Sequence, residues 1–501
     1  MPSVSAASGV SPDKMNSRMD LAQLEEQIDR LKSKLRLAII FGGCKSTPDA
    51  VIYSSRNSRS WKSYEAVAAD IAASLRLIGF QNVELMPDDM TLGDRLRRAG
   101  THLAWLNTSG VQGYNPAAHT AAMLEMFGVP YVGHDPLAAT TLDNKHAFKR
   151  EATCAGLPTA PFATWQMTRG TFRPEVNARF LRAFGDYPGP FVVKPVSGRA
   201  SLHVHFVGDR AGLAAAIQEV YSATGNVVLI EKYLSGREFC IAVAGSVTAR
   251  RGRLTHRGEP FTFAAMERVL ASNEKIFTSM DTRPITRDRC QSLNPRHDAK
   301  ELALMTRLAR DVFLEFNLSS ISRLDLRSDE NGDLFILEAN PKPDLKRPAD
   351  GVTSLIAEGL GQSGMDYDDL ILSLLADRLG HLLTFRWETV GHILELLAAK
   401  SSIAIGGQSG REGEETAFAA YQAARMHAAA AEQDRSRVDA LSKAAAASGD
   451  HETVMHLTEL ATDAGLRSLD SVPTPLKRAR QLRRANAVAK PISKPKLTTN
   501  R

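Results

Sequence analysis

The apolar positions near the N-terminus recur at steps of three and four: Leu21, Leu24, Ile28, Leu31 and Leu35. This spacing predicts an amphipathic helix within residues 20–36. Two heptads are too few to specify a coiled coil, so we expect the helix to dock on the protein's own body, with a dimer contact as the alternative. The polar residues 1–19 before it are predicted to be a disordered leader.

Short apolar runs then alternate with helical patterns up to residue 140. Residues 37–41 (LAIIF), 83–86, 102–107 and 130–133 predict short strands, and helical patterns such as residues 116–127 lie between them. Strands and helices in this rhythm form a parallel open sheet with helices on its faces. Such sheets bind ligands at the carboxyl ends of their strands.

The pattern changes from about residue 141, where a helical stretch is followed by several strands with short connections. These strands predict a mainly antiparallel α+β unit. Residues 322–327 and 334–340 are joined by a turn that contains Asn331-Gly332, a strong signal for a hairpin. Strand patterns stop after about residue 380; residues 381–400 predict one apolar helix, and the Ala-rich stretch beyond it predicts more helices.

These changes divide the chain into six segments. They are a leader with the amphipathic helix (1–36), an open α/β domain (37–140), a small central subdomain (141–235), a C-terminal subdomain (236–379), a helical extension (380–472) and a basic disordered tail (473–501). The expected fold class is an α/β N-terminal open sheet followed by α+β subdomains and an Ala-rich helical C-terminal extension. The 501 residues, 43% of them apolar, are enough for about three domains.

The formal net charge of +6 is concentrated at one end of the chain. Residues 473–501 contain nine Lys and Arg residues and no Asp or Glu, so the remainder is mildly acidic. We therefore expect a solvated, disordered tail, and binding of nucleic acid or of an anionic surface is the less favoured alternative. The four cysteines are scattered without a CxxC pair, and no apolar stretch approaches the ~20 residues that cross a bilayer. We expect a cytoplasmic protein without a membrane partner.

The predicted hairpin carries the strongest chemical signal. Arg323 and Asp325 lie two residues apart on one strand, and Glu338 and Asn340 do so on the other, so each pair shares a face. If the two faces coincide, one patch holds a cation, two carboxylates and a carboxamide oxygen. Hard oxygen ligands of this kind suit Mg²⁺ that is bound together with substrate phosphates. The alternative is a salt bridge on a half-exposed sheet.

Two further signals lie in the central subdomain. Lys194 ends an apolar strand, and the small residues of 197–201 after it have backbone donors that can cover phosphates. Glu231 lies in another buried strand and Glu238 follows the next turn. Their carboxylates are candidates to accept hydrogen bonds from an adenine amino group or from ribose hydroxyls.

In this order the motifs resemble the ATP-grasp superfamily, specifically the D-alanine–D-alanine ligase-like carboxylate–amine ligases, over roughly residues 37–378. The resemblance rests on these segments: MLEMFGVPYVG (123–133), LDNKHAFKREATCAGLPTAPF (142–162), FVVKP (191–195), VLIEKYLSGREF (228–239), RLDLR (323–327), LEANPKP (337–343) and TSLIAEGLGQSGMDYDDL (353–370). It implies an open α/β domain followed by two ATP-grasp subdomains that clamp ATP between two antiparallel sheets.

The resemblance also implies roles for individual residues. The ATP-binding residues would be Lys145, Lys194, Ser201, Glu231, Lys232, Leu234, Glu238, Lys275 and Leu337. Asp325, Glu338 and Asn340 would hold two Mg²⁺ ions, or Mn²⁺ in their place, and Arg323 would stabilise the tetrahedral intermediate. Ser354 would hold the carboxylate of the acceptor. The implied reaction converts a carboxylate to an acyl phosphate with release of ADP; attack by an amine then forms an amide and releases phosphate.

The substrate half departs from the family pattern. Where those ligases have a glutamate that holds the first substrate's amine, this chain has SSRNSRSWKSYEA (54–66), which offers Arg59 and Lys62. Two cations there predict an acidic or carboxylate-bearing small-molecule substrate, whereas an exposed basic loop is the alternative. Three other functions compete with this one. The first is D-alanine–D-alanine ligase activity, and the second is another ATP-grasp reaction, such as that of a glutathione-type or acid–thiol ligase. The third is a non-catalytic ATP-binding regulator that uses the helical extension and the tail.

Overall fold

The computed structural model describes residues 20–44, 46–48, 50–52, 64–198, 201–271, 274–276, 289–349 and 353–398. All of the described residues belong to one compact unit, which lies within residues 1–403. The predicted leader, residues 399–472 of the predicted extension and the basic tail lie outside the described residues. None of the described helices combines the length and the apolar character that crossing a bilayer requires.

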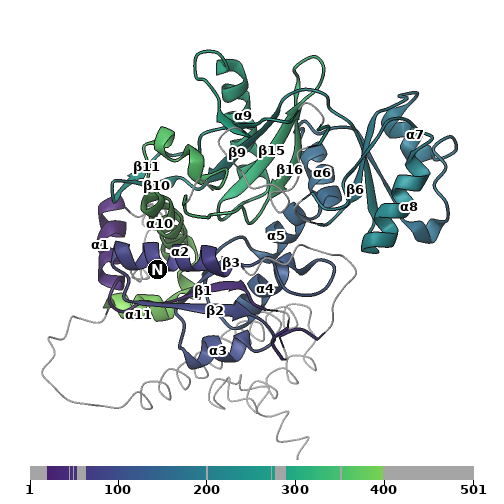
Figure 1. Cartoon of the computed structure of the whole chain (residues 1–501). Coiled ribbons are helices and arrows are strands. Elements are labelled where there is room, and N and C mark those ends of the chain that lie inside the picture. The colour runs from purple at the N-terminus through teal and green to yellow at the C-terminus, as the bar shows by residue number, and fades with distance from the viewer. Residues whose placement is uncertain are drawn as a thin grey trace, which may run out of the picture. The chain divides into compact units, whose positions relative to one another are not determined.

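The N-terminal domain is an open sheet of four parallel strands in the order β2-β1-β3-β4, as the alternating pattern predicts (Figure 1). Its strands are β1 (Arg36–Gly42), β2 (Asn82–Asp88), β3 (Leu103–Asn107) and β4 (Tyr131–Val132). Its helices are α2 (Glu65–Ile78), α3 (Leu92–Arg98) and α4 (His119–Met126); the next helix, α5 (Pro136–Asp143), packs with the C-terminal sheet. Side chains of β1 alternate between the two faces: Leu37 and Ile39 pack with α2, whereas Ala38 and Ile40 pack with α3 and α4. Helices therefore bury both faces of the sheet.

The N-terminal helix α1 (Leu21–Leu31) docks on the protein's own body. Leu24, Ile28 and Leu31 are buried in the largest apolar cluster, together with residues of α10 (Tyr367–Phe385) and α11 (Gly391–Ala398). The Lys34 ammonium, just beyond α1, also lies 3.4 Å from the Leu396 carbonyl oxygen of α11. The apolar stripe is thus used within the chain, as the preferred interpretation predicted.

The prediction of a single helix over residues 381–400 is wrong. Helix α10 continues to Phe385, and the separate helix α11 begins at Gly391. The stripe of buried leucines that starts early in α10 ends with Leu382 and Leu383, so residues 381–385 belong to the last turns of that helix.

The central subdomain contains a four-stranded antiparallel sheet in the order β5-β8-β6-β7. Its elements are β5 (Phe162–Trp165), α7 (Ala178–Phe184), β6 (Phe191–Pro195), β7 (His205–Val207), α8 (Leu213–Thr224) and β8 (Val228–Lys232). Helices α7 and α8 cover one face, where Phe180, Phe184 and Phe191 form an aromatic core. Alternation then places Lys194 and Glu231 on the opposite face of the sheet.

The C-terminal subdomain is built on a second antiparallel sheet, in the order β14-β13-β9-β15-β16, and the short strand β12 pairs with β9. Its elements are β9 (Glu238–Ala244), β10 (Val247–Arg250), β11 (Arg253–His256), β12 (Phe261–Thr262), β13 (Met266–Arg268), β14 (Cys290–Ser292), α9 (Ala299–Glu315), β15 (Ser322–Ser328) and β16 (Leu334–Asn340). One face of the sheet packs on α9 and on α6 (Lys145–Cys154), through side chains that include Ile241, Leu324 and Phe148. The other face carries the charged residues.

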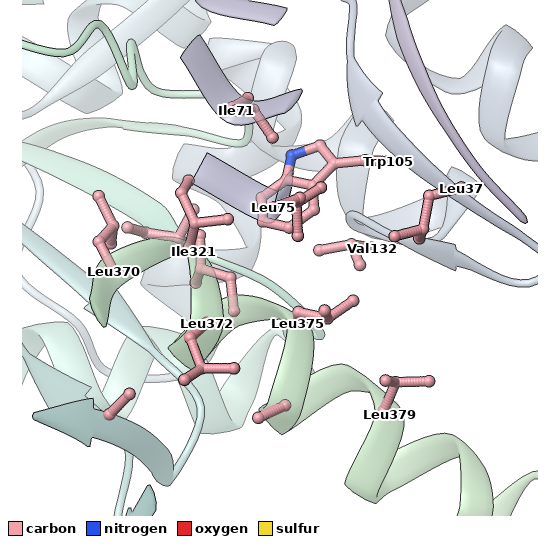
Figure 2. Packing of buried hydrophobic residues seen from close by; sticks show 14 of the residues in the cluster. Leu37, Ile71, Leu75, Trp105, Val132, Ile321, Leu370, Leu372, Leu375 and Leu379 are labelled. Carbon is pink, nitrogen blue, oxygen red and sulfur yellow. The ribbon is translucent and has the colours of Figure 1, made fainter. Parts of the chain in front are cut away.

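Helix α10 joins the N-terminal domain to the C-terminal subdomain. Figure 2 shows Leu370, Leu372, Leu375 and Leu379 of this helix in one cluster with Trp105 and other side chains of the N-terminal domain and with Ile321. The two parts therefore share one apolar core, and the central subdomain has a core of its own.

His134 ties the end of the parallel sheet to the start of β15. It is 3% exposed, and its Nε2 atom donates a hydrogen bond of 3.1 Å to the Ile321 carbonyl. Burial lowers the pKa of His134 to about 4, so the folded protein holds this imidazole neutral at pH values where the unfolded chain protonates it. The associated stability is present above about pH 6.5 and is lost as the pH falls towards 4.

We expect this linkage to remove about 2 kcal/mol of unfolding free energy between pH 7 and pH 5. The H134Q variant keeps a side-chain donor but cannot titrate. Between pH 7 and pH 5 it should therefore lose about 2 kcal/mol less unfolding free energy than the wild type. Equilibrium urea unfolding at the two pH values measures the difference. The exposed His297 provides the control, H297Q. Equal pH dependence in H134Q and the wild type would contradict the expectation.

Candidate active site

The open face of the C-terminal sheet carries charged residues in register. Arg268 of β13 lies opposite Glu238 of β9, which lies opposite Arg327 of β15. Further along the sheet, Asp325 lies opposite Glu338 and Arg323 lies opposite Asn340. The four residues predicted from the hairpin pattern therefore share one face.

These groups are paired and largely buried. Asp325, 4% exposed, accepts bonds from Arg323 at 2.8 and 2.9 Å and from the Asn340 amide at 3.3 Å. The Glu338 carboxylate lies 3.1 Å from the Lys145 ammonium. Burial raises the pKa of Glu338, but the charges of Lys145 and Lys194 outweigh this effect and hold the pKa at about 2. The carboxylates of this cluster are thus held in partly to fully buried ion pairs, and Glu338 is ionised at neutral pH.

Lys145 connects this patch to the loop after β6. It is the first residue of α6, which Asn144 caps by accepting bonds from the backbone of His146 and Ala147. The Lys145 backbone donates to the Val196 carbonyl at 2.7 Å, and its ammonium lies 3.4 Å from the Gly198 carbonyl. A lysine predicted to bind phosphate is therefore held between the small-residue loop and the hairpin.

Lys149, which was not predicted from the sequence, is completely buried one turn further along α6. Its ammonium lies 2.6 Å from one Glu231 carboxylate oxygen, and Lys194 pairs with the other. Burial lowers the pKa of Lys149 more than Glu231 raises it, whereas Glu231 and Glu338 raise the pKa of Lys194 despite burial. Both lysines outweigh burial to lower the pKa of Glu231. In this structure the Glu231 carboxylate, predicted as an adenine contact, binds two ammonium groups.

The segment after β8 lies beside the same sheet. Leu234 is 2% exposed, and the Lys232 ammonium lies 3.6 Å from Glu330 in the hairpin turn. The Tyr233 hydroxyl donates to the Lys275 carbonyl at 3.1 Å, and Arg327 donates to the same carbonyl at 3.0 Å. The backbone of Lys275 is therefore brought to this segment, and its side chain is exposed.

The remaining predicted residues are placed differently. Ser201 is exposed in a turn with φ of 52°, and Leu337 is half-buried on β16. Ser354 is fully buried, and its hydroxyl accepts a bond of 3.1 Å from the Ala357 backbone. Arg59 and Lys62 lie outside the described residues. No contact among the described residues tests the roles predicted for these five, which stay predictions.

Arg268 and Arg327 were also missed. Arg327 continues the alternation of Arg323 and Asp325 along β15, and this spacing was the signal that could have revealed it. Arg268 ends a three-residue strand that the sequence pattern does not predict. Its guanidinium lies 3.0 Å from Glu238 and 3.0 Å from Asp325, which raise the pKa of Arg268 against the effect of burial.

The charges joined by these ion pairs favour an anionic ligand. Six cations, Lys145, Lys149, Lys194, Arg268, Arg323 and Arg327, face four carboxylates, Glu231, Glu238, Asp325 and Glu338. The excess of positive charge suits a phosphate-bearing ligand. The donors of Asp325, Glu338 and Asn340 are carboxylate and amide oxygens, which fit Mg²⁺. Within the described residues no three His, Cys, Asp or Glu side chains gather as a metal site, so such an ion would need further oxygens from its ligand or from water.

Known proteins are similar to this chain over much of its described length. Residues 152–376 match the family model of the D-ala D-ala ligase C-terminus. The uncharacterized protein y4sG of Sinorhizobium fredii is 28% identical over 257 residues, which cover 51% of this chain and 70% of that protein. A D-alanine–D-alanine ligase of Pelotomaculum thermopropionicum is 24% identical over 344 residues, or 68% of this chain and 96% of that one.

A solved structure shows the same fold. The VanG D-Ala:D-Ser ligase from Enterococcus faecalis superimposes with a TM-score of 0.50 at 17% identity, covering 69% of this chain and 99% of that protein. The family match and the relatives together support an ATP-grasp, D-alanine–D-alanine ligase-like protein.

Proposed function

We propose that this chain is an ATP-dependent ligase that joins a carboxylate to an amine through an acyl phosphate, with release of ADP and phosphate. One observation carries the proposal: Lys145 and Lys194 lie close to the hairpin of β15 and β16. This hairpin bears Asp325, Glu338 and Asn340. Lys145 contacts Glu338 directly, and the charge of Lys194 acts on the same carboxylate. Lysines and oxygen ligands from different elements thus converge on one anion site.

In this proposal the two lysines hold the ATP phosphates and the loop with Ser201 closes over them. Glu231, Lys232 and Leu234 hold the adenine, Leu337 packs against it, Glu238 holds the ribose, and Lys275 reaches the γ-phosphate. Asp325, Glu338 and Asn340 would hold two Mg²⁺ ions, which neutralise phosphate charge and polarise the transferred group. The Arg323 guanidinium, which is paired with Asp325, stabilises the oxyanion when the amine attacks. Ser354 holds the acceptor's carboxylate.

Release of ADP and phosphate that depends on both substrates tests this function. The purified full-length chain is incubated with MgATP and panels of acids and amines, including D-alanine, and products are identified by mass. Hydroxylamine in place of the amine should give a hydroxamate, because it traps an acyl phosphate. ADP release without an amide or hydroxamate would contradict the proposal, and binding of ATP without turnover would favour a regulator. The presence of Arg323, Asp325, Glu338 and Asn340 argues against that alternative.

We further propose an acidic or carboxylate-bearing substrate, on the basis of Arg59 and Lys62. A described residue supports this proposal: the Lys342 ammonium lies 3.2 Å from the centre of the Tyr64 ring, and Tyr64 follows the loop that contains both cations. A third positive charge thus lies at the end of this loop.

The K62E variant should lower kcat/KM for the preferred acid at least tenfold relative to neutral substrates, because one carboxylate contact becomes a repulsion. Competition between acids of different charge, followed by product mass, measures the selectivity. K300E makes the same charge change at an exposed position of α9 and should leave selectivity as in the wild type. Unchanged selectivity in K62E would rule out this substrate class for the loop.

A further inference from the structure

Arg268 links two parts of the site that the proposed function treats separately. Its side chain is 10% exposed, and one guanidinium nitrogen lies 3.0 Å from Glu238, the proposed ribose ligand. Another lies 3.0 Å from Asp325 Oδ2, on a proposed metal ligand. Because β13 and β15 flank β9, the guanidinium reaches across the middle strand to make the second contact.

Asp325 Oδ2 is the most heavily used oxygen of the patch. It accepts from Arg268 at 3.0 Å, from Arg323 at 2.9 Å and from Asn340 at 3.3 Å. Arg323 also holds the other oxygen, Oδ1, at 2.8 Å. A divalent ion that binds Asp325 therefore meets an oxygen already shared by two cations, and each of them raises the electrostatic cost of adding a third.

The two arginines hold Asp325 differently. Arg323 belongs to the same strand and binds both carboxylate oxygens, so it orients Asp325 whatever else is bound. Arg268 binds one oxygen and has a second carboxylate, Glu238, to which it remains bonded if it releases Asp325. Its contact with Asp325 can thus be exchanged without leaving a buried charge unpaired.

We propose, on the basis of the proposed function, that Arg268 is a positioning residue that competes with the divalent cation for Asp325 and so sets the metal affinity of the site. Without a metal ion, the Arg268 guanidinium bridges Asp325 and Glu238 and supplies positive charge to both carboxylates. With a metal ion on Asp325, Arg268 would keep its bond to Glu238 and give up its bond to Asp325. Occupancy of the metal end therefore changes the hydrogen bonding of the carboxylate proposed for the ribose.

Direct Mn²⁺ binding to the full-length protein without nucleotide, followed by electron paramagnetic resonance of the free ion, tests this proposal. R268Q should bind Mn²⁺ about tenfold more tightly than the wild type, because it removes a competing positive charge. A gain in affinity separates the proposal from a structural role, since a site that is merely damaged binds the ion more weakly. R268K keeps the charge and should stay within about twofold of the wild type.

The matched control is R237Q. Arg237 precedes β9 and pairs with Glu267 at 2.9 Å and Asp298 at 3.0 Å, so the substitution removes the same charge from a neighbouring ion pair outside the patch. Equal or weaker Mn²⁺ binding by R268Q than by R237Q would overturn the proposal. If R268Q does not fold, R268M takes its place with the same expectation, because its apolar stem can pack as the arginine stem does.

Two outcomes separate this inference from the proposed function. A wild-type protein that binds Mn²⁺ and releases ADP, with R268Q unchanged in Mn²⁺ affinity, would refute the role of Arg268 alone. A wild-type protein that binds neither Mn²⁺ nor ATP would refute both.

Discussion

The E338Q variant is expected to form ADP about 10³-fold more slowly than the wild type at saturating ATP. Glutamine keeps the shape of the side chain but removes the negative charge that lies 3.1 Å from the Lys145 ammonium. In the proposed reaction it also removes a carboxylate ligand of the metal. A coupled assay of ADP release, run over a range of Mg²⁺ concentrations, measures the loss and shows whether metal affinity is part of it.

The control for this variant is E315Q, since Glu315 is exposed at the end of α9. This variant should retain wild-type turnover and stability. A loss smaller than tenfold in E338Q, with the protein folded, would show that Glu338 does not belong to the reacting site.

The E231Q variant is expected to lose roughly 3–5 kcal/mol of unfolding free energy. Glu231 is 2% exposed and is bonded to the ammonium groups of Lys149 and Lys194. Neutral glutamine leaves two buried positive charges close together without an anion between them. Equilibrium urea unfolding followed by tryptophan fluorescence measures the loss.

Two further variants make this expectation specific. E219Q changes an exposed glutamate of α8 in the same subdomain and should alter stability by less than about 0.5 kcal/mol. The K149M substitution in the E231Q background removes one of the two stranded charges and should restore part of the lost stability. An E231Q protein within about 1 kcal/mol of the wild type would mean that the lysines do not depend on Glu231.

The hairpin could be predicted from sequence because its signals are local. Alternation of Arg323 with Asp325 and of Glu338 with Asn340 assigns each pair to a face, and the Asn331-Gly332 turn brings the two strands together. The register of β15 and β16 then aligns Asp325 with Glu338. Local signals were therefore sufficient to place this hairpin, whereas the neighbouring hairpin of β10 and β11 was not predicted.

The missed residues depend on contacts between distant segments. Arg268 lies on a strand of three residues that exists only because β9 and β14 pair with it. Lys149 lies on a largely polar helix, where a lysine would ordinarily face solvent, yet Glu231 of β8 buries it. Propensity and periodicity carry no information about such partners, because tertiary packing decides them.

The separate aromatic core of the central subdomain has a mechanical consequence. Phe180, Phe184 and Phe191 pack only within that subdomain, whereas Phe148 of α6 packs with the C-terminal sheet. The Lys149–Glu231 ion pair therefore crosses from one core to the other. We therefore expect any hinge motion between these two sheets to pass through this polar contact, because neither of the two apolar cores spans the boundary between them.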